Sequence, residues 1–412
     1  MATRTSFTGQ SEQITNCSRR EFLVGSTATT MFAIATSTAC GEGMTCAHAT
    51  CAIPKQFKGH PLFKTPHCGI NFGFLARRGY FSRPEVRKQP ALIRESGPNW
   101  VTLNTHFCQE RYSSTKVFLD FDWSSGEREL VDMVKALHDE GLHVILKPCL
   151  TSLDSAWMGQ VSFPWPHEQQ IQGVRQRYAT DWFDSLRECL SYFGDIAEET
   201  GCEAIFAGAE YNGTTKFDEE WRKTIAHVRK HFGGPVSYEF MPEEPRQRPL
   251  KWFNDLDFLA LSTYPTGVES YTAQIKWKDM PPIPKSTMEK SLARHVPLVE
   301  SFVEKFGNKP ILFSEIGTRS CRGCVNIPGD YQTESIWDGQ EQADYMDAAF
   351  KTFSAIPAWL GLSWWKWDET QHTRHHYSPD PLKDRGFTIC GKPAAIVMRK
   401  WAKEWHGIKS ES

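Results

Sequence analysis

Two glutamates stand where apolar segments of the chain end. Glu315 follows the apolar residues of KPILFSEIGT, and Glu210 closes the apolar segment EAIFAGAE. A short apolar segment bounded by turn residues is typical of a strand that is covered on both faces. A carboxylate at the end of such a strand is costly unless it is paired, hydrogen-bonded or used in chemistry. Either glutamate alone could form a structural ion pair, so the choice between a structural and a catalytic role depends on the surrounding elements.

The pattern of elements predicts how the two glutamates are positioned. From residue 67 onward, apolar strand-like segments alternate with amphipathic helical segments. Eight strand-then-helix units predict an α/β fold of the closed (β/α)8 TIM barrel type. An open, doubly wound sheet is the alternative, but no glycine-rich phosphate loop follows the first strand. The expected strands are residues 68–74, 100–107, 143–150, 203–210, 235–241, 257–265, 310–317 and 359–367.

Such a barrel would bring the two glutamates face to face. Chemistry in TIM barrels takes place at the C-terminal ends of the strands. Glu210 ends the fourth expected strand and Glu315 ends the seventh, so they lie on opposite sides of the mouth. Retaining glycoside hydrolysis needs two carboxyl groups about 5–5.5 Å apart, one as nucleophile and the other as acid and then base. The pair therefore predicts a retaining glycoside hydrolase.

The N-terminal region is expected to be an export signal. SRREFL, at residues 18–23, is a twin-arginine signature, and the apolar segment that follows it is too polar and too short for a membrane anchor. We expect residues 1–39 to be a signal peptide for the twin-arginine export machinery and residues 40–59 to be a tether. Residues 60–408 would form one catalytic domain of a bacterial protein exported to the periplasm or beyond. Cleavage would leave Cys40 first, so a lipid anchor is an open alternative.

The composition excludes some partners and leaves others open. Lysine plus arginine (47) nearly balances aspartate plus glutamate (49), so nothing favours nucleic acid or an acidic membrane surface. The 15 tryptophans serve core packing for the most part, and some could stack on the apolar faces of sugar rings. No internal repeat is present, and we expect a monomer.

Two groups of residues invite a metal interpretation that the sequence does not favour. Cys321 and Cys324 form a lone CxxC without a second pair, which fits a local disulfide or two free thiols better than a metal site. His372, His375 and His376 lie after the last expected strand, with no carboxylate at ligand spacing. We therefore expect no metal and no organic cofactor.

Several segments together resemble Glycoside Hydrolase Family 113. The resemblance rests on LKPCL, AGAEYNG, DFLALSTYP, PILFSEIGTRS and the closing SWWKWDE with GKPAAIVMRKW, and it spans residues 67–406. That family consists of clan A retaining enzymes best known as β-mannanases. The resemblance thus implies a β-linked polysaccharide or oligosaccharide as substrate, with β-mannan as the first expectation.

The resemblance also implies roles for individual residues. Glu210 would be the general acid/base and Glu315 the nucleophile, and Tyr264 would donate a hydrogen bond to the nucleophile. Trp365 or Trp364 would floor the sugar subsite next to the scissile bond. Because side chains alternate along a strand, only one of these tryptophans can face the barrel interior, and we favour Trp365.

Departures from the family pattern leave the substrate open. Ala209 stands where many clan A enzymes have an asparagine that contacts the sugar 2-hydroxyl, and Cys149 stands where related sequences often have a larger polar group. The loop after Glu315 is extended and contains the CRGC pair. An exo-acting β-glycosidase or transglycosylase on another β-glycan is therefore an alternative. A non-catalytic carbohydrate-binding barrel is a further one, although such a protein would be expected to have lost one glutamate.

Further polar residues near the expected strand ends could bind sugar hydroxyls. Their side chains are of the right type, but each could equally serve the packing of the barrel. They are Lys147, Asn71, Arg77 and His106.

Overall fold

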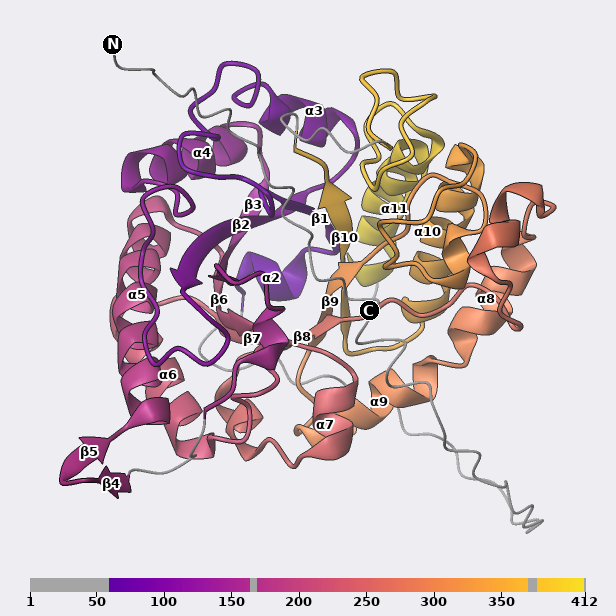
Figure 1. Cartoon of the computed structure of the whole chain (residues 1–412). Coiled ribbons are helices and arrows are strands. Elements are labelled where there is room, and N and C mark those ends of the chain that lie inside the picture. Colours follow the sequence, from indigo (N-terminus) through magenta and orange to yellow (C-terminus); the bar gives the residue numbers. More distant parts are fainter. Residues whose placement is uncertain (1–58, 164–168, 370–375, 411–412) are drawn as a thin grey trace, which may run out of the picture.

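The chain folds into a closed barrel of eight parallel strands, and the predicted (β/α)8 barrel is confirmed (Figure 1). The computed structural model describes residues 59–163, 169–369 and 376–410. The expected signal peptide, nearly all of the expected tether with Cys40, and His372 and His375 lie outside these residues. In order around the ring, the strands are β1 (His67–Phe72), β2 (Trp100–Gln109), β3 (His143–Ser152), β6 (Ala204–Ala209), β7 (Val236–Phe240), β8 (Leu259–Ser262), β9 (Ile311–Ile316) and β10 (Trp359–Trp367).

Helices surround the ring of strands, as Figure 1 shows. The connection after β7 is the exception, because it contains only a short helix and a 3-10 turn, α7 (Glu243–Gln247) and η3 (Lys251–Asp255). The outer helices are α3 (Gln89–Glu95), α4 (Glu127–Asp139), α5 (Tyr178–Thr200), α6 (Asp218–His231), α8 (Lys285–Ala293), α9 (Val296–Lys305), α10 (Gly339–Phe353) and α11 (Pro393–Ser410). Among the described residues, no helix is long and apolar enough to span a bilayer.

Two connections differ from the sequence pattern. The apolar spacing of residues 286–307 predicts one helix, but α8 ends at Ala293 and α9 begins at Val296. Pro297 lies in the first turn of α9, where its missing N–H is tolerated, and it could not continue a helix from the preceding turn. The long loop after β3 contains a small antiparallel hairpin, β4 (Gln169–Ile171) with β5 (Val174–Gln176).

The N-terminal end of the barrel is closed by apolar side chains. The short helix α2 (Pro61–Lys64) places Leu62 and Phe63 in a buried cluster with side chains from six of the strands or the residues beside them. The cluster includes Trp100, Ile145, Phe206, Phe258, Leu312 and Leu360. Because this end is filled, a substrate can approach the interior only from the C-terminal ends of the strands.

A polar layer lies above this apolar plug and ties strands together. Ser363 of β10 lies 2.9 Å from His67 Nε2 and 2.8 Å from Thr102 Oγ1. Asn71 Nδ2 donates to the carbonyl oxygen of Ser314 in β9, at 2.9 Å. These buried bonds join β1, β2, β9 and β10 and fix the register of these four strands.

Most tryptophans pack in the core outside the barrel, as the composition suggested. Trp221 and Trp252 stack with centroids 4.8 Å apart, and Trp359 stacks on Trp405 at 5.0 Å. All four are buried. Their rings fix the helices on the barrel wall, which keeps the strand ends rigid.

Candidate active site

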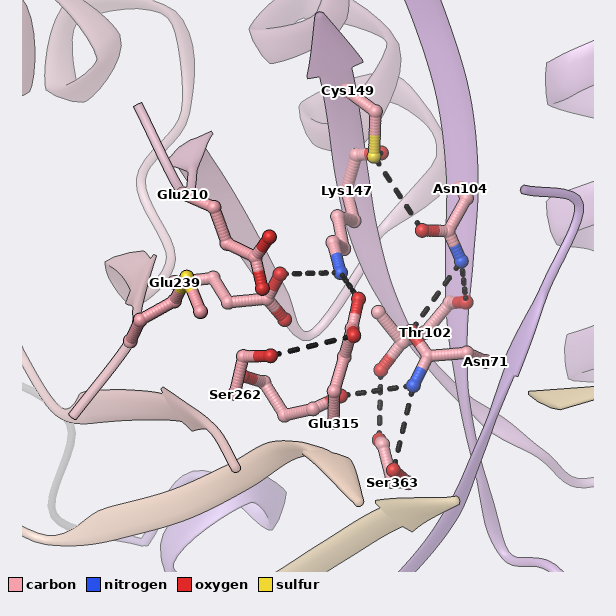
Figure 2. Close-up of polar contacts among 12 residues, drawn as sticks. Asn71, Thr102, Asn104, Lys147, Cys149, Glu210, Glu239, Ser262, Glu315 and Ser363 are labelled. Atoms are coloured by element: carbon pink, nitrogen blue, oxygen red, sulfur yellow. Dashed lines mark hydrogen bonds and ion pairs between the residues drawn. The ribbon is translucent and has the colours of Figure 1, made fainter. Parts of the chain in front are cut away.

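The two glutamates singled out in the sequence meet at the mouth of the barrel. Glu315 lies in β9 and Glu210 directly follows β6, and both side chains are buried. One carboxylate oxygen of each lies within 4.8 Å of the other, and the Glu239 carboxylate of β7 lies within the same limit of both. Figure 2 shows the three carboxyl groups pointing toward one another. This separation suits the paired carboxyl groups of a retaining glycosidase.

Glu210 is held in an unusual backbone conformation. Its φ is 57°, in the left-handed region that non-glycine residues rarely adopt. Its backbone N–H donates to the carbonyl oxygen of Glu239 at 2.8 Å, and the next N–H, of Tyr211, donates to Tyr238 Oη at 2.7 Å. Strained residues of this kind persist where the surroundings fix them, often at functional sites. Here the two hydrogen bonds hold the backbone so that the Glu210 carboxyl group points into the mouth of the barrel.

Glu315 accepts hydrogen bonds from three side chains. Lys147 Nζ lies 2.7 Å from Oε1, while Tyr264 Oη donates to Oε2 at 2.8 Å and Ser262 Oγ donates to the same oxygen at 3.4 Å. Hydrogen bonds and a positive charge at this range favour the ionised carboxylate. These contacts favour a charged Glu315 carboxylate in a fixed orientation. The expected hydrogen bond from Tyr264 is present.

Glu239 is a member of the site that the sequence analysis missed. Its Oε1 lies 2.6 Å from Lys147 Nζ, so that one ammonium group bridges Glu239 and Glu315 (Figure 2). Burial, and then the nearby charge of Glu315, raise the pKa of Glu239 to about 8. The signal in the sequence was a glutamate near the end of the fifth expected strand, in VSYEF.

Lys147, a weaker candidate in the sequence, lies at the centre of the site. Burial alone would lower the pKa of its ammonium group, but Glu239 and then Glu315 outweigh burial and raise that pKa above its usual value. Lys147 is therefore a permanent cation near neutral pH. Its ammonium group also lies 5.7 Å from the centroid of the Trp365 ring.

The two tryptophans of β10 point to opposite sides of the strand. Trp365 packs edge-on against Phe74 at 4.7 Å and lies beside Lys147, so it faces the mouth. Trp364 is fully buried, with its ring against Tyr345 of α10 and its Nε1 donating to the carbonyl oxygen of Phe387 at 3.1 Å. Only Trp365 is therefore placed to meet a sugar, and Trp364 belongs to the barrel–helix core.

Another tryptophan, which the sequence analysis did not select, also contacts the carboxylate pair. Trp157 Nε1 donates to Glu210 Oε2 at 3.3 Å from the loop after β3. Nothing in the sequence of that loop distinguishes this ring from the core tryptophans. Its position over Glu210 adds a second aromatic side chain to the mouth.

Asn71 and His106 direct their polar groups to the protein itself. Asn71 donates to backbone carbonyls of β9 and β10, as part of the polar layer. His106 contacts the carbonyl oxygen of Phe74 through Nε2 at 2.7 Å and the hydroxyl of Thr151 through Nδ1 at 2.9 Å. Burial lowers the pKa of His106 to about 4, so its ring is neutral near pH 7. Both residues support the loops and strands of the site from below.

The other candidates lie farther from the carboxylates. The Arg77 guanidinium group stacks on Trp123 at 4.1 Å from an exposed position on the loop after β1. Cys321 and Cys324 are buried free thiols that pack with Trp277. Cys149 lies beside Asn104 in the barrel, and burial raises the pKa of its thiol to about 12.

The three glutamates are the one group of three or more potential metal ligands in the described part of the chain. Two of them already face the ammonium group of Lys147, at 2.6 and 2.7 Å. That cation balances one negative charge of the cluster from within the protein. The arrangement is therefore suited to proton transfer and nucleophilic attack by carboxylates.

Comparisons with known proteins agree with this geometry. The sequence profile of Glycoside Hydrolase Family 113 matches residues 70–392. A solved GH113 β-1,4-mannanase superimposes with a TM-score of 0.69 at 24% identity, covering 82% of this chain and 99% of that chain. The GH113 β-mannanase AaManA from Alicyclobacillus acidocaldarius, in complex with ManMIm, gives a TM-score of 0.67 at 24% identity, covering 83% and 99%. A comparison with curated protein sequences found no significant match.

The matched region contains every residue of the site and runs from Ile70 in β1 to Lys392, directly before α11. The solved relatives share the barrel over nearly their whole length. On the family match, this chain is a glycoside hydrolase and a member of Glycoside Hydrolase Family 113.

Proposed function

We propose that the protein hydrolyses a β-linked glycan with retention of configuration, by double displacement through a covalent glycosyl-enzyme. The observation that carries the proposal is the buried pair of Glu210 and Glu315, one of which accepts hydrogen bonds from Lys147 and Tyr264. Two carboxyl groups at this separation can act on the two faces of one anomeric carbon. Family membership supports the reaction class.

In the first step, Glu315 attacks the anomeric carbon and the bond to the leaving oxygen breaks. Glu210 gives its proton to that oxygen, so the departing sugar leaves as an alcohol. In the second step, water attacks the same carbon, Glu210 takes the proton of the water, and the bond to Glu315 breaks. Glu315 returns to its ionised form, and the product has the configuration of the substrate.

The remaining residues of the mouth orient these events. Tyr264 donates to Oε2 of Glu315 and Lys147 to Oε1, so the carboxylate is held in one orientation for attack. Trp365 offers a ring face as the floor of the subsite next to the scissile bond, and Trp157 steadies the Glu210 carboxyl group. Charge that develops on the sugar is thereby met by groups that need no reorganisation.

The substrate class that we favour is β-mannan. The support is the family match together with the solved relatives, which are β-mannanases. Exo-acting hydrolysis or transglycosylation of another β-glycan is the second candidate, because the loop after β9 is extended and its Gly329 lies against the ring of Tyr264. A barrel that only binds carbohydrate is disfavoured, because it would have no use for an intact carboxylate pair.

We also propose that the protein acts after export. The support is SRREFL at residues 18–23 and the following apolar segment, with lipidation of Cys40 as an open possibility. Replacing Arg19 and Arg20 by lysine should leave the protein in the cytoplasm. Continued export of the double variant by the same route would contradict this assignment.

The Glu210 assignment can be tested by chemical rescue. Glu210→Ala should retain turnover only of β-glycosides whose leaving group needs no protonation, and added azide should trap a β-configured glycosyl azide. The purified domain is screened on β-mannan and other β-glycans, and the products are read by NMR. Unchanged turnover of substrates with poor leaving groups would exclude Glu210 as the acid/base.

A further inference from the structure

Glu239 is a buried carboxylate that the proposed double displacement does not use directly. Its side chain is 1% exposed, its Oε1 lies 2.6 Å from Lys147 Nζ, and its Oε2 has no hydrogen-bond partner among the described residues. The same ammonium group lies 2.7 Å from Glu315 Oε1. In Figure 2, Lys147 reaches between the two carboxylates, and Glu210 approaches Glu239 from the other side.

The balance of charge between Lys147 and the three glutamates determines how many protons the site holds near neutral pH. With all three carboxylates ionised, the negative charge would exceed the single positive charge of Lys147. Buried excess charge of this kind is costly, so the cluster keeps a proton near neutral pH. Carboxylates within 4.8 Å of one another titrate together, and the proton therefore belongs to the cluster as a whole.

We propose that Glu239 is a positioning residue that keeps the catalytic carboxylates in the state with one shared proton. This proposal rests on the function proposed above. Glu315 is held ionised by Lys147 and Tyr264. Glu239 adds a third carboxyl group to the cluster, so the cluster retains one shared proton, which the departing oxygen requires. Without Glu239, the same proton would leave the cluster at a lower pH.

The covalent intermediate gives Glu239 a second task. When Glu315 becomes an ester, it loses its charge, and Lys147 loses that counter-ion. Glu239 still lies 2.6 Å from the ammonium group and keeps it compensated. When water cleaves the ester, the charge returns to Glu315 beside a lysine that has not moved. Glu239 thus serves both steps without touching the reacting atoms.

Of the other titratable groups that face the cluster, Cys149 and Tyr211 carry no charge near neutral pH, and Glu244 lies on the Glu210 side, away from Lys147. Burial raises the pKa of Cys149 to about 12 and the pKa of Tyr211 well above its usual value, so both are uncharged near neutral pH. Glu244 of α7, which lies toward Glu210, has a pKa raised to about 8 by burial and titrates in the same range. The facing groups are Lys147 and Cys149 from β3, Glu210 and Tyr211 after β6, Glu244 from α7, Tyr264 after β8 and Glu315 from β9.

The first test is the pH dependence of kcat/KM in Glu239→Gln. The amide keeps the size of the side chain and can still accept from Lys147, but one negative charge is gone. Both limbs of the profile should move to lower pH, by about one pH unit. Lys147→Met removes a positive charge, and both limbs should move to higher pH. Glu341→Gln, which removes a buried glutamate of α10 outside the cluster, should leave both limbs in place.

A loss of activity in Glu239→Gln with unmoved limbs would show a merely structural contact and overturn the proposal. A second test needs no substrate. The protein is labelled with 13C at the glutamate side-chain carboxyls and titrated by NMR. Glu239→Gln should lower the pH at which the remaining carboxyls of the cluster lose their last proton, while the resonance of Glu341, outside the cluster, stays in place.

The two tests separate this proposal from the proposed function. If no β-glycan is cleaved, the proposed function fails, and the NMR titration alone decides about Glu239. An unchanged titration of the cluster in Glu239→Gln contradicts the role of Glu239 whether or not the protein is active. A shifted NMR titration together with shifted limbs of the kcat/KM profile supports both the proposed function and the role of Glu239.

Discussion

At the scale of residues, Glu315 is held by donors of unequal strength. Its Oε2 accepts from Tyr264 Oη at 2.8 Å and from Ser262 Oγ at 3.4 Å. Hydroxyl donors bind a charged oxygen best near 2.6 Å, and the bond weakens steeply beyond 3 Å. Tyr264 therefore stabilises the anionic nucleophile much more than Ser262 does.

This difference gives a prediction with an internal control. Tyr264→Phe removes only the hydroxyl group and should lower kcat/KM by about 10- to 100-fold, the range for a hydrogen bond to a charged group. Ser262→Ala removes the longer bond to the same oxygen and should cost about threefold or less. Steady-state kinetics of the two variants on one β-glycan provides the comparison. Equal losses of kcat/KM would show that the two distances do not predict which hydrogen bond contributes more.

The sequence revealed residues whose role is visible on their own strand. It did not reveal residues whose partners lie on other strands. Glu210 and Glu315 were identifiable because a carboxylate at the end of an apolar strand is conspicuous along the chain. Glu239 was missed because its significance depends on Lys147, which lies on β3, two strands away around the ring. His106 was considered as a sugar ligand because it lies near a strand end, but both of its ring nitrogens contact the protein. Such pairings across the barrel cannot be deduced from one strand.

At the scale of elements, the alternation of β10 separates structure from function. Trp364 lies in the core against Tyr345 and donates to a backbone carbonyl oxygen. Trp365, one residue on, faces the mouth next to Lys147 and Phe74. The same residue type therefore serves packing at one position and the substrate subsite at the next.

Crossed measurements on the two tryptophans test this division. Trp364→Ala leaves a large cavity and should lower the free energy of unfolding by about 3–5 kcal/mol. Trp365→Ala should change stability less, yet lower kcat/KM about 10-fold or more through loss of the sugar platform. Urea denaturation and kinetics are measured on both variants. A Trp365 variant that is destabilised as much as the Trp364 variant, with normal kinetics, would reverse the assignment.

The succession of elements was predictable because a parallel barrel repeats one pattern eight times. Each strand is buried on both faces and each helix has one apolar stripe, so the two types differ along the chain. Local breaks were harder to place. The division of the expected helix into α8 and α9 at Pro297 depends on whether the tertiary structure uses proline as a first-turn residue or as a kink. The hairpin of β4 and β5 lacked a long apolar pattern, and a three-residue strand leaves little trace in sequence.

At the scale of the whole molecule, several glutamates are buried where an ion is unfavourable. Burial raises the pKa of Glu244 to about 8 and that of Glu341 to about 7, while the ordinary value is 4.5. A folded-state pKa above that of the unfolded chain means that the folded protein binds more protons between the two values. The stability that these groups contribute is therefore full below about pH 4.5 and is lost as the pH rises through 7 to 8.

This linkage predicts that Glu244→Gln flattens the pH dependence of stability. The wild-type free energy of unfolding should fall between pH 5 and pH 8, with a contribution from Glu244 on the order of a few kcal/mol. In the variant, that part of the fall should disappear. Glu85→Gln, which changes an exposed glutamate, should leave the curve unaltered. Urea denaturation at a series of pH values gives the answer, and a parallel fall in wild type and Glu244→Gln would refute the assignment.

The central claim is that Glu315 attacks the anomeric carbon from a rigid strand of the barrel. A mechanism-based 2-deoxy-2-fluoro-β-glycoside of the cleaved sugar stabilises the glycosyl-enzyme against hydrolysis, so the labelled residue can be found by peptide mapping. The label should lie on Glu315, within KPILFSEIGT, and Glu315→Gln should take up none. A label on Glu239 or Glu210, or a product of inverted configuration from the unmodified substrate, would contradict the account.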